Sequence, residues 1–200
     1  MKKGVLITFI LSVLLITSCK KDEVDSSIDE DKKESPIKDI KFLDVSSYTD
    51  WVYFSFSEEK VVEIEDYTNS LDWDIAFHRG DIRTNGGTSG IGKAEALDTG
   101  LKDWDKVTTI PEDGYKKDEI GIVTIAFTGS GPEEEEQSFS QVLTSWLTID
   151  TSTPPPVYTL TKSIFVIKTA DGKYVKALFY DNRDAKNKNG AISFKYEFLE

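Results

Sequence analysis

The C-terminal part of the chain alternates large apolar and polar side chains with a period of two, which restricts it to β-strands. In residues 192–198 isoleucine, phenylalanine, tyrosine and phenylalanine are separated by serine, lysine and glutamate. Successive strand residues point to opposite faces, so these four large side chains share one face. Residues 164–170 and 173–180 are expected to form a hairpin, because Asp171-Gly172 supplies the positive φ angles of a tight turn. Together these segments predict an antiparallel meander.

Short runs of aromatic and β-branched residues upstream, bounded by Gly, Asp, Asn and Pro, give the same strand pattern. They are Trp51–Ser57, Lys60–Ile64, Leu71–Phe77 and Glu119–Phe127. Helical signals are few: residues 137–147 fit either a short helix or a strand, and Pro132 with Glu133–Glu136 suggests an exposed turn or helix start. The sequence therefore predicts a mostly β fold, a single domain of antiparallel sheets with few short helices over residues 41–200.

The N-terminus has the pattern of a secretory signal. Lys2 and Lys3 precede the apolar run Val5–Ile16, which is too short to span a membrane. Residues 16–19, Ile-Thr-Ser-Cys, resemble the bacterial lipobox. We therefore expect residues 1–18 to be a lipoprotein signal peptide and Cys19 to carry the lipid. Residues 19–40 are highly charged and are expected to form a flexible tether.

A lipid on Cys19 predicts attachment to the outer membrane of a Gram-negative bacterium, with membrane lipid as a partner. The sequence KKDE at residues 20–23 resembles the acidic signal that sends some lipoproteins to the outer face of that membrane. A solvated linker is equally compatible with these residues. We expect the domain to face the exterior of the cell.

The charge balance argues against nucleic acid as a partner. Removal of Lys2 and Lys3 from 24 basic residues leaves 22 against 36 acidic ones, a formal charge of −14. Affinity for nucleic acids depends largely on Lys and Arg side chains that neutralise phosphates. An acidic surface repels those phosphates.

The only histidine, His78, lies in the stretch LDWDIAFHRGDIRTNGG, residues 71–87. Alternation in residues 71–77 puts His78 on the polar side of a strand, and Gly80 then shifts the pattern as a bulge or bend would. Arg79, Asp81 and Arg83 alternate around this bend. We expect His78 and these three residues to form a hydrogen-bonded, ion-paired structural network, not a metal site.

The sequence offers little for catalysis, and we expect the protein not to be an enzyme. It contains no GxSxG or HExxH motif, and lipidation of Cys19 would consume the only thiol. We therefore assign no catalytic residue and no metal ligand. A glycosidase-type carboxylate pair stays open, but 36 acidic residues make any chosen pair uninformative.

Five segments together resemble one family, the HmuY haem-binding lipoproteins of bacteria. They are WDIAFHR (73–79), RTNGGTSG (83–90), PPVY (155–158), FVIKTADGKY (165–174) and ISFKYEF (192–198). The resemblance implies a mostly β, hand-like fold with a cleft that accepts haem outside the cell. It also implies delivery of haem to an outer-membrane receptor.

Members of that family hold haem iron with two histidines or with methionine, located after the strand that matches IAFHR. The corresponding residues 115–158 contain neither, and the chain without its signal peptide has His78 as its only imidazole and no methionine. Tyrosine oxygen also ligates ferric haem, and an aromatic slot can hold a porphyrin without strong ligation. Tyr115, Trp146 and Tyr158 are therefore the candidate haem-binding residues.

Two function classes follow. The first is a surface protein that captures haem or a related porphyrin for handover to a receptor. The second is a non-haem binding or adhesion module that recognises a glycan or a protein partner, with Trp51, Trp104 or Trp146 stacked on sugar rings. A Soret band on haem titration distinguishes the two.

Overall fold

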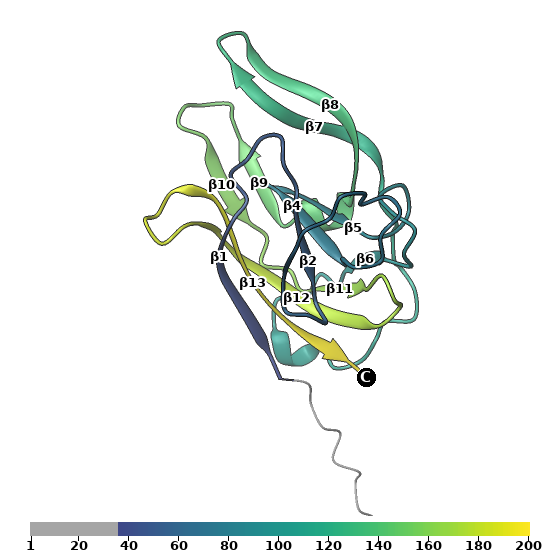
Figure 1. Cartoon of the computed structure of the whole chain (residues 1–200). Helices are drawn as coiled ribbons and strands as arrows, with labels where there is room; N and C mark the ends of the chain where they lie inside the picture. Colours follow the sequence, from purple (N-terminus) through teal and green to yellow (C-terminus); the bar gives the residue numbers. More distant parts are fainter. Residues whose placement is uncertain (1–35) are drawn as a thin grey trace, which may run out of the picture. The chain divides into compact units, whose positions relative to one another are not determined.

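The computed structural model describes residues 36–200. The expected signal peptide, Cys19 and most of the expected tether lie outside the described residues. Within residues 36–200, antiparallel strands form sheets of five, four, two and two strands (Figure 1). The prediction of a mostly β, single-domain fold with few short helices is confirmed. No helix in this part of the chain is long and apolar enough to cross a membrane.

The five-stranded sheet contains the predicted C-terminal meander with one further strand at each edge. Its order is β1-β13-β12-β11-β6, and every neighbouring pair is antiparallel. The first strand begins at Lys38, so residues 38–40 of the expected tether pair with β13. The strands are β1 (Lys38–Asp44), β6 (Glu95–Asp98), β11 (Phe165–Lys168), β12 (Tyr174–Arg183) and β13 (Asn189–Leu199).

The four-stranded sheet has the order β3-β2-β4-β5. Its members are β2 (Val52–Ser55), β3 (Lys60–Val62), β4 (Ile75–His78) and β5 (Asp81–Thr84). Only residues 75–77 of the expected strand 71–77 pair with neighbouring strands. Asp74 instead uses its buried carboxylate to accept hydrogen bonds from the backbone N–H groups of Phe56 and Ala170, at 2.9 and 3.0 Å. The Asp74 carboxylate thus connects the start of β4 to the segments after β2 and β11.

Two further hairpins extend beyond the larger sheets (Figure 1). One pairs β7 (Glu119–Thr128) with β8 (Gly131–Phe139), and the other pairs β9 (Leu147–Asp150) with β10 (Val157–Leu160). Between them lies the short helix α1 (Gln141–Thr144), and a 3-10 turn, η1 (Trp104–Lys106), precedes β7. For residues 137–147 the sequence allowed either a helix or a strand, and both occur. The Ser140 hydroxyl accepts a hydrogen bond from the Leu143 N–H and so starts a short helix between strands β8 and β9.

Two local predictions were wrong. Glu133–Glu136 lie in strand β8, not in a turn or helix start, because they pair with the isoleucine-rich β7 while their carboxylates stay in solvent. The turn at Asp171-Gly172 is longer than a two-residue turn. Only Gly172 has a positive φ, 97°, and the Thr169 N–H donates to the Lys173 carbonyl at 2.8 Å.

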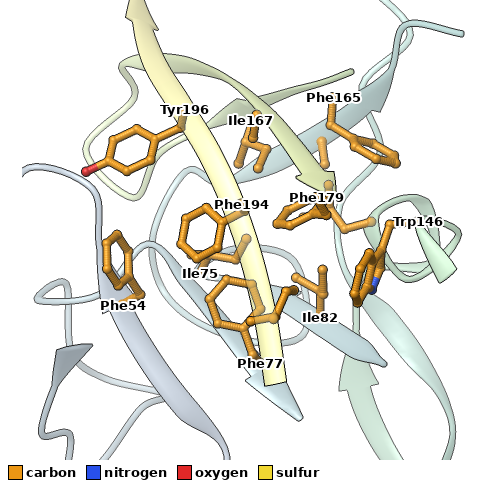
Figure 2. Close-up of a cluster of buried hydrophobic side chains, with 14 of the residues drawn as sticks. Phe54, Ile75, Phe77, Ile82, Trp146, Phe165, Ile167, Phe179, Phe194 and Tyr196 are labelled. Carbon is orange, nitrogen blue, oxygen red and sulfur yellow. The ribbon is translucent and has the colours of Figure 1, made fainter. Parts of the chain in front are cut away.

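The two larger sheets are joined by a core of aromatic side chains (Figure 2). The alternation that predicted β13 places Phe194 inward, 5.4 Å from the ring of Phe54 and 5.2 Å from the ring of Phe77. Phe179 of β12 lies 5.7 Å from Trp146, which closes the core beside α1. Edge-on and tilted aromatic pairs of this kind add to the stabilisation from apolar burial.

A buried carboxylate ties the loop after β5 to the start of β7. Asp118 is 2% exposed and accepts hydrogen bonds from the Thr84 N–H, the Thr84 hydroxyl and the Ser89 hydroxyl at 2.7, 2.8 and 2.6 Å. Burial nevertheless raises the pKa of Asp118 to about 6, against the lowering effect of these donors and of Arg83. The loop after β5 packs closely against this anchor: a side chain at Gly87 would collide with the backbone of Asp118.

We expect Asp118 to make the protein relatively more stable in mild acid. A carboxyl group whose pKa is about 6 when folded and near 3.8 when unfolded keeps its proton more tightly in the folded state. Its contribution is present below the unfolded value and is lost as pH rises through 6. The measurement is the difference in unfolding free energy between wild type and Asp118→Asn in urea, from about pH 7 to about pH 4. The wild type should gain relative to the variant as pH falls, and a flat or opposite trend would contradict this.

Candidate functional site

A groove of about 450 Å³ lies between the two projecting hairpins, and the turn between β4 and β5 also borders it. Its lining is mostly apolar, and its volume falls within the size range of small-molecule sites. The residues that line it and carry the argument below are Tyr48, Arg79, Ile122, Phe127, Ile149 and Tyr158.

Large apolar side chains of both hairpins remain uncovered in this groove. Ile122 and Phe127 of β7 are 55% and 60% exposed, and Ile149 of β9 is 45% exposed. A bulge between Thr124 and Ala126 shifts the register of β7, so that both Ile122 and Phe127 reach the groove. Across the β9–β10 ladder, Tyr158 is paired with Ile149 and shares its face. A two-stranded hairpin has no second layer to cover such a face, which leaves an apolar surface available to a ligand.

Arg79 and Tyr48 form the polar end of the groove. The Arg79 guanidinium lies 3.8 Å from the centre of the Tyr48 ring and donates to the Ser46 carbonyl at 2.8 Å. The Tyr48 ring in turn meets Phe127 edge-on, with centroids 5.9 Å apart. These contacts connect the loop after β1 to the tip of the β7–β8 hairpin.

The turn at Arg79 and Gly80 fixes this part of the groove. Arg79 has a φ of 55°, in the left-handed region, and its N–H donates to the Val45 carbonyl at 3.0 Å. The indole N–H of Trp146 donates to the Gly80 carbonyl at 2.9 Å. The expected bulge or bend at Gly80 is therefore the tight turn of a hairpin, in which His78 pairs with Asp81.

His78 is buried beneath this turn, 1% exposed, and does not line the groove. Its Nε2 lies 2.8 Å from the Tyr48 carbonyl, which can only accept, so Nε2 carries the proton. Its Nδ1 lies 3.6 Å from the Asp81 carboxylate, and the ring stacks on Trp51 at a centroid distance of 5.1 Å. Both ring nitrogens thus face protein atoms.

Arg83 is buried between two aromatic rings. Its guanidinium carbon lies 3.6 Å from the centre of Trp51 and 4.6 Å from that of Tyr67, and burial lowers its pKa from the ordinary value. The Gln137 side-chain oxygen accepts hydrogen bonds from Arg83, at 3.2 Å, and from the Trp51 indole, at 2.9 Å. Arg83 thus lies at the base of the β7–β8 hairpin beside Gln137, whereas Arg79 reaches the tip of that hairpin through Tyr48, and a cation–π contact holds each arginine.

The structure separates the three candidate haem-binding residues. Tyr158 lines the groove. Trp146 is 1% exposed and packs in the core, with its indole directed at Gly80. Tyr115 belongs to a different cluster, where its ring lies 5.7 Å from Tyr174 and burial raises its pKa to about 12.

Sequence reasoning missed the other groove residues. Ile122 and Phe127 read as ordinary strand residues, and nothing in their pattern shows that the hairpin lacks a covering layer. Tyr48 lies in a short loop, and Arg79 was assigned only a structural role. The one available signal was the excess of isoleucine in β7 opposite a run of four glutamates, which is unusual for a strand that packs on a core.

The groove can be compared with the porphyrin that the family resemblance implies. Its uncovered isoleucine and phenylalanine side chains suit a flat apolar ring. Only the phenol oxygens of Tyr48 and Tyr158 and the carboxylate of Asp81 match the ligands of a ferric iron, since no imidazole or thioether lines it. No cluster of three or more His, Cys, Asp or Glu within residues 36–200 could hold a free metal ion. The lining thus fits the ring better than the metal.

Comparison with solved structures supports the fold. The chain is 28% identical to an apo HmuY analog from Tannerella forsythia, with a TM-score of 0.68 over 86% of this chain and 100% of that one. It is 25% identical to a protein from Bacteroides vulgatus described as HmuY-like and haem-binding, with a TM-score of 0.66 over 80% and 90% of the two chains. A lipoprotein from Bacteroides fragilis, 20% identical, has a TM-score of 0.64 over 84% and 90% and shows the fold alone.

The comparison with curated proteins found no match. The family model of the HmuY protein, in contrast, matches residues 47–196. This range includes the four-stranded sheet, both projecting hairpins, every groove residue named above, and the five-stranded sheet except β1 and the end of β13. The chain therefore belongs to the HmuY family.

Proposed function

We propose that the protein binds haem or a related porphyrin in the groove between the β7–β8 and β9–β10 hairpins. The observation that carries this proposal is the pair of uncovered apolar faces, from β7 and β9, that border one groove of about 450 Å³. Membership in the HmuY family and the haem-binding description of the relative from Bacteroides vulgatus support it. Burial of such side chains against a flat apolar ring is favourable by about 25 cal/mol per Å² of apolar surface removed from water.

Each side of the groove has a role in this proposal. Ile122, Phe127 and Ile149 contact the ring, and Tyr48 and Tyr158 border it with aromatic edges. When bound, haem supplies a ferric iron that accepts an oxygen ligand, and the Tyr158 hydroxyl is the candidate that both the sequence and the groove geometry select. The absence of an imidazole in the lining makes ring contacts the main source of affinity.

We further propose that the protein is a lipoprotein anchored through Cys19 to the outer membrane and exposed to the exterior. In that position the groove captures a porphyrin and passes it to an outer-membrane receptor, and the protein acts as a carrier, not as an enzyme. The lipobox-like residues 16–19 and the charged residues 19–35 motivate this part of the proposal. An uncovered, open groove suits a carrier because the ligand must leave it again.

A glycan-binding module is the less favoured alternative. The tryptophans considered for sugar stacking are not exposed platforms: Trp146 is buried, and Trp51 and Trp104 are half-buried. Trp51 is covered by Arg83 and His78, and Trp104 lies beneath Lys176 and Lys195. None of the three lines the groove.

Ile122→Glu should weaken haemin binding at least about tenfold. The substitution puts a carboxylate into the apolar wall, where it must lose water or repel the ligand. Because Ile122 is 55% exposed, the melting temperature should change little. The matched control is Ile91→Glu, at a residue 58% exposed that does not line the groove. Equal haemin affinity in the two variants would place the ligand elsewhere.

His78→Ala should lower stability more than it changes haemin affinity. The variant loses a buried hydrogen bond and an aromatic stack, at a cost of about 2 kcal/mol in unfolding free energy. Thermal unfolding and a haemin titration on the same preparation measure both effects. A variant that keeps its melting temperature but loses its Soret band would show that His78 serves the ligand directly.

A further inference from the structure

A second, polar hollow continues the groove on its other side. It has a volume of about 510 Å³, and the lining residues that matter below are Tyr158, Lys162, Asn182, Arg183, Asn187 and Asn189. A narrow hollow of about 30 Å³ joins the two, since it shares Arg79 and Ile149 with the apolar groove and Asn182 and Asn189 with the polar one. Tyr158 borders all three. The three hollows thus form one depression with an apolar half and a polar half.

The polar half offers hydrogen-bond donors and positive charge. Asn182 is 6% exposed, and its amide donates to the Asn189 side chain at 3.2 Å, which leaves the Asn189 amide N–H groups free to donate. Arg183 donates to the Asn187 side chain at 2.9 Å, and its Nε lies 3.4 Å from Asp181. Arg183 has five N–H donors, so these contacts leave some of its guanidinium N–H groups available to a ligand.

Lys162 adds a second cation opposite the turn between β12 and β13. Its side chain is exposed, and none of the ion pairs within residues 36–200 involves it. Lys186 and Lys188 lie in the turn that follows Arg183, between β12 and β13, but do not line the hollow. In a chain of formal net charge −12, this end of the depression is locally basic.

The opposite end of the depression is acidic. In the β7–β8 ladder Glu136 pairs with Ile122 and Glu134 pairs with Thr124, and directly opposed residues point to the same face. Ile122 and Thr124 line the groove, so both glutamates are on the groove side of β8. Asp81 lines the groove as well. Arg79 also lines the groove, but its guanidinium already donates to the Ser46 carbonyl and lies over the Tyr48 ring. The excess of carboxylates therefore repels an anionic ligand from this end, and the cations of the polar hollow attract it.

We propose that a porphyrin binds with its ring in the apolar groove and its propionate carboxylates directed to Lys162, Arg183 and the neighbouring asparagines. This inference rests on the proposed porphyrin-binding function and assigns the orientation of the ligand. Charge-assisted hydrogen bonds from Arg and Lys are the strongest recognition that a carboxylate finds on a protein surface. Because these contacts are made by the ring and the carboxylates, the site selects planar dicarboxylates and accepts metal-free as well as iron-containing porphyrins.

The test compares two porphyrins and two double variants of the full chain by tryptophan fluorescence quenching. The ligands are metal-free protoporphyrin IX, with two free propionates, and its dimethyl ester. Lys162→Gln with Arg183→Gln removes both cations of the polar hollow. Lys186→Gln with Lys188→Gln removes the same charge from the neighbouring turn between β12 and β13 without touching the lining and serves as the control.

The first double variant should bind protoporphyrin IX about tenfold more weakly than wild type, while the control stays within about twofold. Both should bind the dimethyl ester as wild type does, which also shows that the variants are folded. Equal losses in both double variants, or no loss in either, would overturn the orientation and leave the porphyrin function in place. Failure of the wild type to bind haemin and protoporphyrin IX saturably would overturn the function itself.

Discussion

The candidate site depends on the turn at Arg79 and Gly80. A φ of 55° at a non-glycine residue costs about 1 kcal/mol or more, so the surrounding contacts must hold it. The Arg79 N–H and guanidinium bind carbonyls of the loop after β1, and Trp146 binds the Gly80 carbonyl from the core. Because Arg79 also lies over Tyr48, the same turn that connects two strands positions one wall of the groove.

The aromatic residues fall into two groups with different structural roles. Phe54, Phe77, Phe179 and Phe194, from β2, β4, β12 and β13, pack in edge-on and tilted pairs between the two larger sheets and are almost fully buried. Those near the hairpins either anchor the hairpin base, as Trp51 does with Arg83 and Gln137, or remain uncovered, as Phe127 does. A rigid base below an uncovered apolar face is what a site for a flat ligand requires.

The sequence was sufficient for the fold but not for the site. Alternation around Phe194 predicts β13 and its buried face because the core beneath it covers every second residue. The same alternation cannot show that Ile122 stays uncovered, since that depends on which segments pack over β7. Of the three candidates chosen by position, only Tyr158 lines the groove. The sequence does not distinguish Tyr115 from Tyr158, because a half-buried tyrosine has the same local pattern in a packed cluster as at a groove.

The central claim is that the groove between the hairpins binds a porphyrin, and a haemin titration of the full chain tests it most directly. Difference absorbance is recorded in the ferric and reduced states, with albumin and an unrelated β protein as controls. Saturable one-to-one binding with a distinct Soret band is the predicted result, and the band positions distinguish tyrosinate from unligated iron. Weak, unsaturable absorbance like that of the unrelated β protein would contradict the claim and leave a HmuY fold that has taken a different ligand.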